Sequence, residues 1–157
     1  MIRERKHRLT TDAYKGPRVC SFTACIKDRE ALFIAEDIFQ KNENFLLTSI
    51  HSSSVEAEVY LFMPDHARFL LRGTQEDSDV LEAMKAYKQQ SGFWLHKHYP
   101  DVRWQKYFYD HIERSEEDVE KRIRYILNNP VRKGLVDDWQ TYPFKGSTIH
   151  DFNEWDC

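Results

Sequence analysis

One histidine, one tyrosine and two arginines in this sequence are spaced so that they could act together on a phosphate group. His66 and Arg68 lie two residues apart in an otherwise apolar run, and residues two apart on a strand point to the same face. Tyr125 follows Arg122 by three residues and precedes Asn129 by four, so the three share one side of a helix. An arginine there could pair with a phosphate oxygen, and an amide oxygen could be a metal ligand.

Each of these residues also has an ordinary structural explanation. A lone histidine on an apolar strand is more often a hydrogen-bonded core residue than a ligand. Tyr125 could be a half-buried aromatic at a helix edge, and Asn129, directly before Pro130, could simply end a helix. From these residues alone the structural interpretation is favoured, so the case for a site depends on further motifs.

An aromatic segment and scattered cations form a second candidate surface. Trp104, Tyr107, Phe108 and Tyr109 are interleaved with basic side chains, which suits a stacking platform for unpaired bases but equally a plain core. We expect Trp104 and Phe108 to be buried and Tyr107 or Tyr109 to be accessible. Positive residues that could contact phosphates gather here and further along the chain: Arg103, Lys106, Arg122, Arg124, Arg132 and Lys133.

Bulk composition indicates one globular domain. The chain has 157 residues, of which 41% are hydrophobic and 31% charged, and its net charge of −3 gives no support by itself for a nucleic-acid partner. No stretch approaches the roughly 18 apolar residues of a membrane span, so we expect no membrane association. Three cysteines without Cys-x-x-Cys spacing favour free thiols and a cytoplasmic location.

The element pattern predicts an α+β fold. We expect an irregular lead-in over 1–17, a main domain over 18–147 and a tail over 148–157. Within the domain, Asp28 could cap the first helix and Ser115 the last. The expected elements are a strand at 18–26, a helix at 29–40, strands at 45–52, 55–63 and 66–72, a helix from 77 or 78 to 97, a fifth strand within 102–112, a helix from 116 to 129, and an extended wrap beyond it. This order suits a ferredoxin-like antiparallel sheet with helices packed on one face.

Four motifs in order resemble one protein family. Met63-Pro64-Asp65-His66-Ala67-Arg68 is similar to a Met-Pro-Asn-His-x-His motif, and Trp104–Arg114 to a Trp-Gln block. Tyr125–Val136 is similar to a Tyr-Ile-x-x-Asn-Pro-Val block, and Trp139–Ser147 to a closing Trp-Pro element. Together they resemble the single-tyrosine HUH transposases of the insertion-sequence 200-like type, including the tyrosine transposase-like proteins associated with repetitive extragenic palindromes (REP).

The resemblance implies a function and a set of site residues. Tyr125 would be the nucleophile that attacks a phosphate and forms a phosphotyrosine link, and His66 with Asn129 would hold Mg²⁺ or Mn²⁺. The partner would be single-stranded or hairpin DNA, bound by a monomer or a homodimer. Residues contributing DNA contacts would be Arg103, Lys106, Tyr107, Tyr109, Arg122, Arg124, Arg132 and Lys133.

Arg68 departs from the motif, because the family has a second metal-binding histidine at this position. A guanidinium has no lone pair to donate, so metal affinity should be weakened or lost. Two alternatives follow. Arg68 could take the place of the metal and bind the phosphate, or cutting is lost and a DNA-binding descendant remains. A third hypothesis is an α+β interaction module with no nucleic-acid role, which would fail to bind DNA at low salt.

Overall fold

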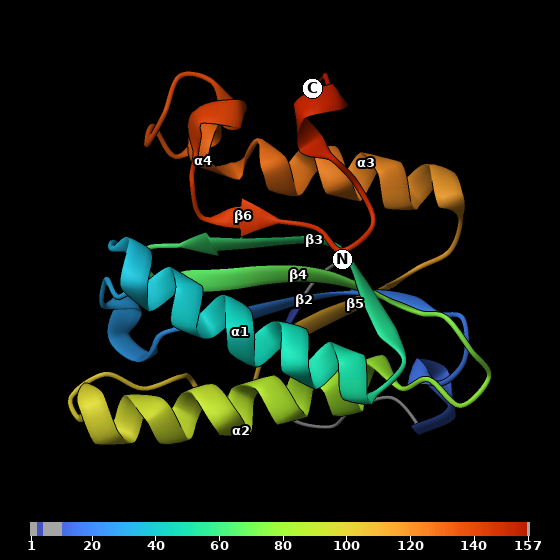
Figure 1. Cartoon of the computed structure of the whole chain (residues 1–157), viewed down its shortest axis with the longest axis horizontal. Helices are drawn as coiled ribbons and strands as arrows, with labels where there is room; N and C mark the ends of the chain where they lie inside the picture. The colour runs from blue at the N-terminus through green and yellow to red at the C-terminus, as the bar shows by residue number, and fades with distance from the viewer. Residues whose placement is uncertain (1–2, 5–10, 157) are drawn as a thin grey trace.

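The computed structural model describes residues 3–4 and 11–156, and its centre is an antiparallel sheet. Among these residues the strand order is β1-β5-β2-β4-β3-β6 (Figure 1). The four longer strands alternate with two helices in the chain order β2, α1, β3, β4, α2, β5. The strands are β1 (Arg3–Glu4), β2 (Val19–Cys25), β3 (Val55–Met63), β4 (His66–Gly73), β5 (Tyr109–Glu113) and β6 (Lys145–Gly146).

Helices α1 (Glu36–Ser52) and α2 (Val80–His98) pack side by side on one face of the sheet (Figure 1). They bury the β4 residues Ala67, Phe69 and Leu71 in the larger hydrophobic core. This arrangement confirms the predicted α+β class, and the order β5-β2-β4-β3 with two crossover helices is that of a ferredoxin-like fold. Strand β4 lies in the middle of the sheet, as its apolar sequence predicts.

The opposite face is covered by α3 (Glu116–Leu127), the short α4 (Asn129–Arg132) and the C-terminal segment (Figure 1). The buried stripe of α3, which includes Val119 and Ile123, packs with Leu61 and Leu70 in a second core. The predicted placement of helices on one face holds for α1 and α2, whereas α3 differs from it by packing on the opposite face. Since His66 and Arg68 alternate with Ala67 and Phe69, they project towards this second face.

The first helix differs from its prediction. It begins at Glu36 instead of residue 29 and continues to Ser52, through the predicted break at 42–44 and the predicted strand at 45–52. Asn42 is tolerated inside the helix because its amide is fully used: Nδ2 donates to the Ile38 carbonyl at 2.9 Å, and Oδ1 accepts from the Tyr87 hydroxyl at 2.9 Å. Tertiary packing thus outweighs the local tendency of asparagine to end helices.

Smaller differences occur elsewhere. Asp79, not residue 77 or 78, caps α2 by accepting from the Glu82 amide at 3.0 Å, whereas Ser115 caps α3 as predicted. The expected extended tail contains α4 and two 3₁₀ turns, η3 (Trp139–Thr141) and η4 (Phe152–Glu154). Part of the predicted lead-in lies outside the described residues. Within the described part of the lead-in, β1 pairs with β5, and η1 (Thr11–Tyr14) forms a further 3₁₀ turn. No described helix is both long and apolar enough to cross a bilayer.

Alanine substitutions at two glycines should change the free energy of unfolding in opposite directions. A Cβ at Gly73 would collide with the Gly16 carbonyl oxygen and lie 2.9 Å from Ser78 Cβ, whereas at Gly92 in α2 the nearest atom is 3.9 Å away. We expect Gly73→Ala to lower the free energy of unfolding by roughly 1–3 kcal/mol. Gly92→Ala should raise it by up to about 1 kcal/mol, because alanine is the better helix former. Urea unfolding measures both, and an unchanged Gly73→Ala protein would contradict this packing.

Candidate active site

Tyr125, His66 and Arg68 line one pocket, on the face where α3 crosses the sheet. The pocket has a volume of about 530 Å³, and Asn129 and Arg122 also line it. The helical spacing that placed Arg122 and Asn129 on the side of Tyr125 therefore gives the arrangement found. Side chains from β2, β4, β5, α3 and α4 meet here, together with Arg29 and Lys133.

His66 is buried and held at both ring nitrogens. Its Nδ1 lies 2.7 Å from Asp65 Oδ1, and its Nε2 lies 3.3 Å from Asn129 Nδ2. Burial lowers the pKa of His66, although Asp65 opposes the shift, so the neutral imidazole is favoured. A neutral ring that donates from Nδ1 to Asp65 has its lone pair on Nε2, where it accepts from the Asn129 amide.

Arg68 is a largely buried cation that forms no ion pair with a carboxylate of the described residues. Its Nε is enclosed and has no hydrogen-bond partner among the described residues. Burial lowers the pKa of Arg68, the interaction with Tyr125 opposes this, and the nearby charges of Arg122 and Arg132 lower it further. Because a buried charge without a counter-ion is unfavourable, an anion that entered this pocket would be bound favourably by the guanidinium.

Two guanidinium groups lie over the ring of Tyr125, which is 49% exposed. The Cζ of Arg132 is 3.8 Å from the ring centroid and that of Arg68 is 5.2 Å away. Nη2 of Arg132 also donates to the Tyr125 carbonyl at 2.7 Å and to Asn129 Oδ1 at 3.3 Å. The tyrosine therefore stands in a positively charged surrounding that suits a phosphate.

The described residues do not fit a divalent cation well. No group of three or more His, Cys, Asp or Glu side chains in the described ranges could hold a metal. Asn129 directs its oxygen to Arg132 and its NH₂ group to His66, so the amide is turned away from ligation. Arg68, which stands where the motif described above has its second histidine, carries a positive charge and no lone pair.

Arg29 belongs to the pocket but was not identified from the sequence, which placed it in a helix. Asp28 and Arg29 instead have positive φ angles of 61° and 57°, a conformation that is uncommon outside glycine. It brings Arg29 Nε to 2.9 Å from Asp65 Oδ2 and Nη1 to 3.4 Å from Cys25 Sγ. Burial acts to raise the pKa of Asp65, but the hydrogen bonds and charges of His66 and Arg29 together outweigh it and lower this pKa. Arg29 thereby fixes the carboxylate that orients His66.

Thr23 and Cys25 of β2 also line the pocket without having been predicted. Thr23 pairs with Arg68 and Cys25 with His66 across the sheet. Only the strand register reveals this proximity, and the register could not be read from the sequence.

Seven of the eight predicted DNA-contacting residues fall into two groups. Arg122, Tyr109, Arg132 and Lys133 lie in or beside the pocket, with Arg122 Nε 2.7 Å from Glu113 Oε1. Tyr109 also lines a neighbouring hollow of about 490 Å³ that contains Arg103 and Lys106, and the Lys106 ammonium lies over the Tyr107 ring. Trp104 and Phe108 are buried, and Tyr107 and Tyr109 are partly accessible, as expected.

Arg124 lies outside this surface. It pairs with Glu120 at 3.0 Å, its guanidinium lies 4.9 Å from the Trp155 ring centroid, and it donates to the Asp156 carbonyl. Its side chain is thus engaged with the C-terminal segment, although Arg124 directly precedes Tyr125 in the sequence.

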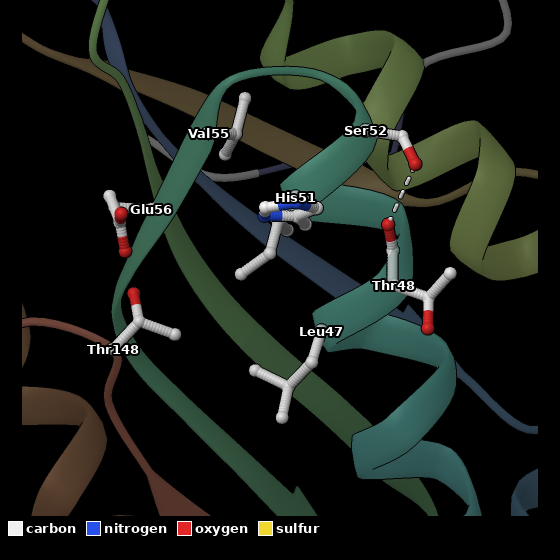
Figure 2. A pocket seen from close by; sticks show the side chains of 8 residues that line it. Leu47, Thr48, His51, Ser52, Val55, Glu56 and Thr148 are labelled. Carbon is white, nitrogen blue, oxygen red and sulfur yellow. Dashed lines mark hydrogen bonds between the residues drawn. The ribbon is translucent and has the colours of Figure 1, made fainter.

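A further pocket lies at the other end of the sheet, between the end of α1 and the start of β3 (Figure 2). Leu47 and Val55 form its apolar wall, and Glu56 contributes a carboxylate. The described residues that line it include no lysine or arginine. It therefore offers no counter-charge for a phosphate, in contrast to the pocket around Tyr125.

Comparison with known proteins identifies the family. The family model described as "Transposase IS200 like" matches residues 20–129. The chain belongs to the IS200-like transposase family. This confirms the resemblance seen in the four motifs, and the matched segment includes His66, Arg68, Tyr125 and Asn129.

This IS200-like transposase has relatives that are distant from it in sequence. The REP-associated tyrosine transposase of Escherichia coli K12 is 23% identical over 129 residues, covering 82% of this chain and 74% of the relative. A Haemophilus influenzae protein, provisionally named as the same type, is 24% identical over 140 residues, covering 82% and 78%. A solved structure of a REP-associated tyrosine transposase bound to a REP hairpin has a TM-score of 0.69 at 20% identity, covering 90% of this chain and 81% of that one. At this identity the likeness supports the fold.

The stability of the protein should depend on pH through His66. Burial lowers the pKa of His66 in the folded chain, whereas in the unfolded chain it titrates near about 6.5. The contribution is therefore complete above about pH 6.5 and is lost as the pH falls below it, by at most about 1.4 kcal/mol per pH unit. Urea unfolding at about pH 7.5 and about pH 5.5 should show a larger loss for wild type than for His66→Gln. His96→Gln, at an exposed position, is the matched control and should behave like wild type; equal losses in all three would contradict the assignment.

Proposed function

We propose that this protein binds single-stranded or hairpin DNA and cuts it through Tyr125, with Arg68 neutralising the phosphate in place of a metal ion. The observation that carries the proposal is the buried Arg68 guanidinium, whose Nε has no partner among the described residues and which lies over the Tyr125 ring. Membership of the IS200-like transposase family supports strand cleavage as the reaction class. The relative bound to a REP hairpin supports a palindromic DNA element as the ligand.

The reaction would be a transesterification. The Tyr125 oxygen attacks phosphorus, a tyrosyl–phosphorus bond forms, and one bond from phosphorus to a sugar oxygen breaks. The phenol loses one proton and the leaving sugar oxygen gains one, so no oxidant, reductant or nucleotide is consumed. Negative charge that develops on the phosphate would be stabilised by Arg68 and Arg132, which are in place before the substrate arrives.

His66 and Asn129 would position groups around Tyr125 instead of holding a cation. Asn129 accepts from Arg132 and donates to His66, so it links the imidazole to the guanidinium that lies over the tyrosine ring. Mg²⁺ or Mn²⁺ has no assigned step in this scheme, because Asn129 directs its oxygen to Arg132 and Arg68 cannot be a ligand.

The DNA strand would run from the hollow at Arg103 and Lys106 to the pocket at Tyr125. Tyr109 lines both and joins them into one surface. Phosphates would be bound by the cations along this path and bases would stack on the accessible tyrosines. The residues assigned to this interface are Arg103, Lys106, Tyr107, Tyr109, Arg122, Arg132 and Lys133.

A covalent adduct assay tests cleavage. Labelled hairpin and single-stranded DNA are incubated with the protein in EDTA, Mg²⁺ or Mn²⁺ and resolved on a denaturing gel. Wild type should form an adduct in EDTA, and Tyr125→Phe should form none. Arg68→Ala should form it roughly 100- to 1,000-fold more slowly, the range seen when one preorganised donor to a developing oxyanion is removed. Arg124→Ala is the matched control, because Arg124 is an arginine of the same region that lies outside the pocket.

Two results would change the conclusion. An adduct that persists in Tyr125→Phe would remove Tyr125 as the nucleophile. If wild type forms no adduct while Arg68→His gains one only with Mg²⁺ or Mn²⁺, the protein is a non-cleaving DNA-binding descendant of the family.

Salt dependence tests the assigned interface. Each neutralised phosphate releases counterions, so affinity for a single strand should fall steeply with salt concentration. Removing one contact, as in Lys106→Ala, should weaken binding at low salt and reduce the slope of log affinity against log salt by roughly 0.7 for a single strand. Arg124→Ala should leave the slope unchanged. A wild-type affinity that does not change with salt would contradict the electrostatic assignment.

A further inference from the structure

A second hollow adjoins the Tyr125 pocket and takes no part in the chemistry proposed above. It has a volume of about 250 Å³ and shares Arg29, His66 and Lys133 with that pocket. We propose that it is a subsite for one unpaired nucleobase carrying an exocyclic amino group, next to the phosphate bound by Arg68. The inference rests on the proposed DNA-binding function and deepens it by assigning a determinant of base recognition.

The walls of the hollow are apolar, which suits the face of a base better than a phosphate. Ala31, Met63, Pro64 and Leu135 line it. Leu135 is 45% exposed, so a large apolar side chain stands at the rim without being covered. Gly134, at a φ of +74°, makes the left-handed turn that brings the chain from α4 to Leu135.

Backbone hydrogen bonds hold the walls of the hollow in place in the free protein. The amides of Leu32 and Phe33 donate to the Pro64 carbonyl at 2.7 and 3.1 Å, which ties the segment after Arg29 to the β3–β4 turn. The Ile26 amide donates to the Asp65 carbonyl at 2.9 Å. A preformed pocket of this kind avoids the free energy of ordering its walls during binding.

Asp65 supplies the polar group that selects the base. Its carboxylate lines this hollow but not the Tyr125 pocket, and it would repel a phosphate there. One oxygen bonds to His66 and the other to Arg29, yet the side chain remains 28% exposed. A carboxylate has about four acceptor positions, so it can still accept an amino group such as that on C4 of cytosine.

Two basic side chains shared by the two hollows would place the base beside the phosphate. Arg29 and Lys133 stand at the boundary shared by the two hollows, where the sugar–phosphate backbone would pass from one to the other. The apolar hollow is thus continuous with the cationic pocket, and consecutive parts of one nucleotide strand can occupy both.

The test uses a hairpin with a single-stranded extension in which one abasic residue is moved along the extension. Affinities are measured with the full chain by fluorescence anisotropy. One position should be sensitive, with binding weakened roughly fivefold or more, as expected for loss of one base contact. At that position deoxycytidine should bind more tightly than deoxyuridine, which has a carbonyl group in place of the amino group.

Two variants and a matched control assign the effect to the hollow. Ala31→Trp fills it and Leu135→Ser removes an apolar wall; both residues are exposed, so folding should be preserved, and circular dichroism verifies this. In both variants, an abasic residue at the sensitive position should no longer weaken DNA binding. Ile149→Ser changes a side chain of similar exposure, 44%, elsewhere on the surface. In this control, an abasic residue at the sensitive position should still weaken DNA binding.

The outcomes separate this subsite from the function on which it rests. If no DNA binds, the proposed function and the subsite both fail. If DNA binds but all abasic positions are equal, or the sensitive position survives Ala31→Trp, only the subsite is wrong. Equal affinity for deoxycytidine and deoxyuridine would overturn the role of Asp65 as an amino-group acceptor.

Discussion

The arrangement around Tyr125 depends on one unfavourable interaction, the burial of a positive charge at Arg68. A guanidinium that is removed from water and left without an acidic partner reduces stability. Two neighbouring arginines differ from Arg68 because each has a carboxylate partner. Arg122 is paired with Glu113, and Arg29 is paired with Asp65. These ion pairs fix two cations in place, whereas the stabilising neighbour of Arg68 among the described residues is Tyr125 and not a carboxylate. In the proposed function, a phosphate would supply the counter-charge that Arg68 does not receive from a described carboxylate.

The fold can hold such a charge because both sides of β4 are fixed by packing. Ala67, Phe69 and Leu71 are buried under α1 and α2, so the strand cannot rotate to expose Arg68. On the other face Leu70 packs with α3 in the second core, which also sets the distance between the sheet and Tyr125. The rigidity that positions the catalytic candidates therefore comes from the apolar residues that alternate with them.

Sequence motifs were sufficient for the central residues and insufficient for their surroundings. The spacing of His66 and Arg68, and of Arg122, Tyr125 and Asn129, depends only on strand and helix periodicity, and the structure brings all five to one pocket. Arg29 reaches the pocket through two residues with positive φ, which no pattern of side chains indicated. Arg124 was grouped with its basic neighbours, but non-local packing of Trp155 engages it elsewhere. The error in α1 has the same origin, since the partner that satisfies Asn42 is Tyr87, which lies 45 positions later in the chain.

In the proposed scheme, an arginine at the position of a metal-binding histidine changes more than the number of ligands. A metal ion brings its charge with it and leaves the empty site with neutral imidazoles, whereas an arginine is charged at all times. The remaining polar groups must then adapt to a permanent cation. Asn129 illustrates this, because its oxygen accepts from Arg132 and its NH₂ group faces the lone pair of His66. A histidine introduced at position 68 would leave that orientation in place, since Arg132 holds it independently of Arg68. Arg68 and the turned amide of Asn129 thus belong to one arrangement, and in the proposed function they supply a positive charge at the phosphate from the chain itself.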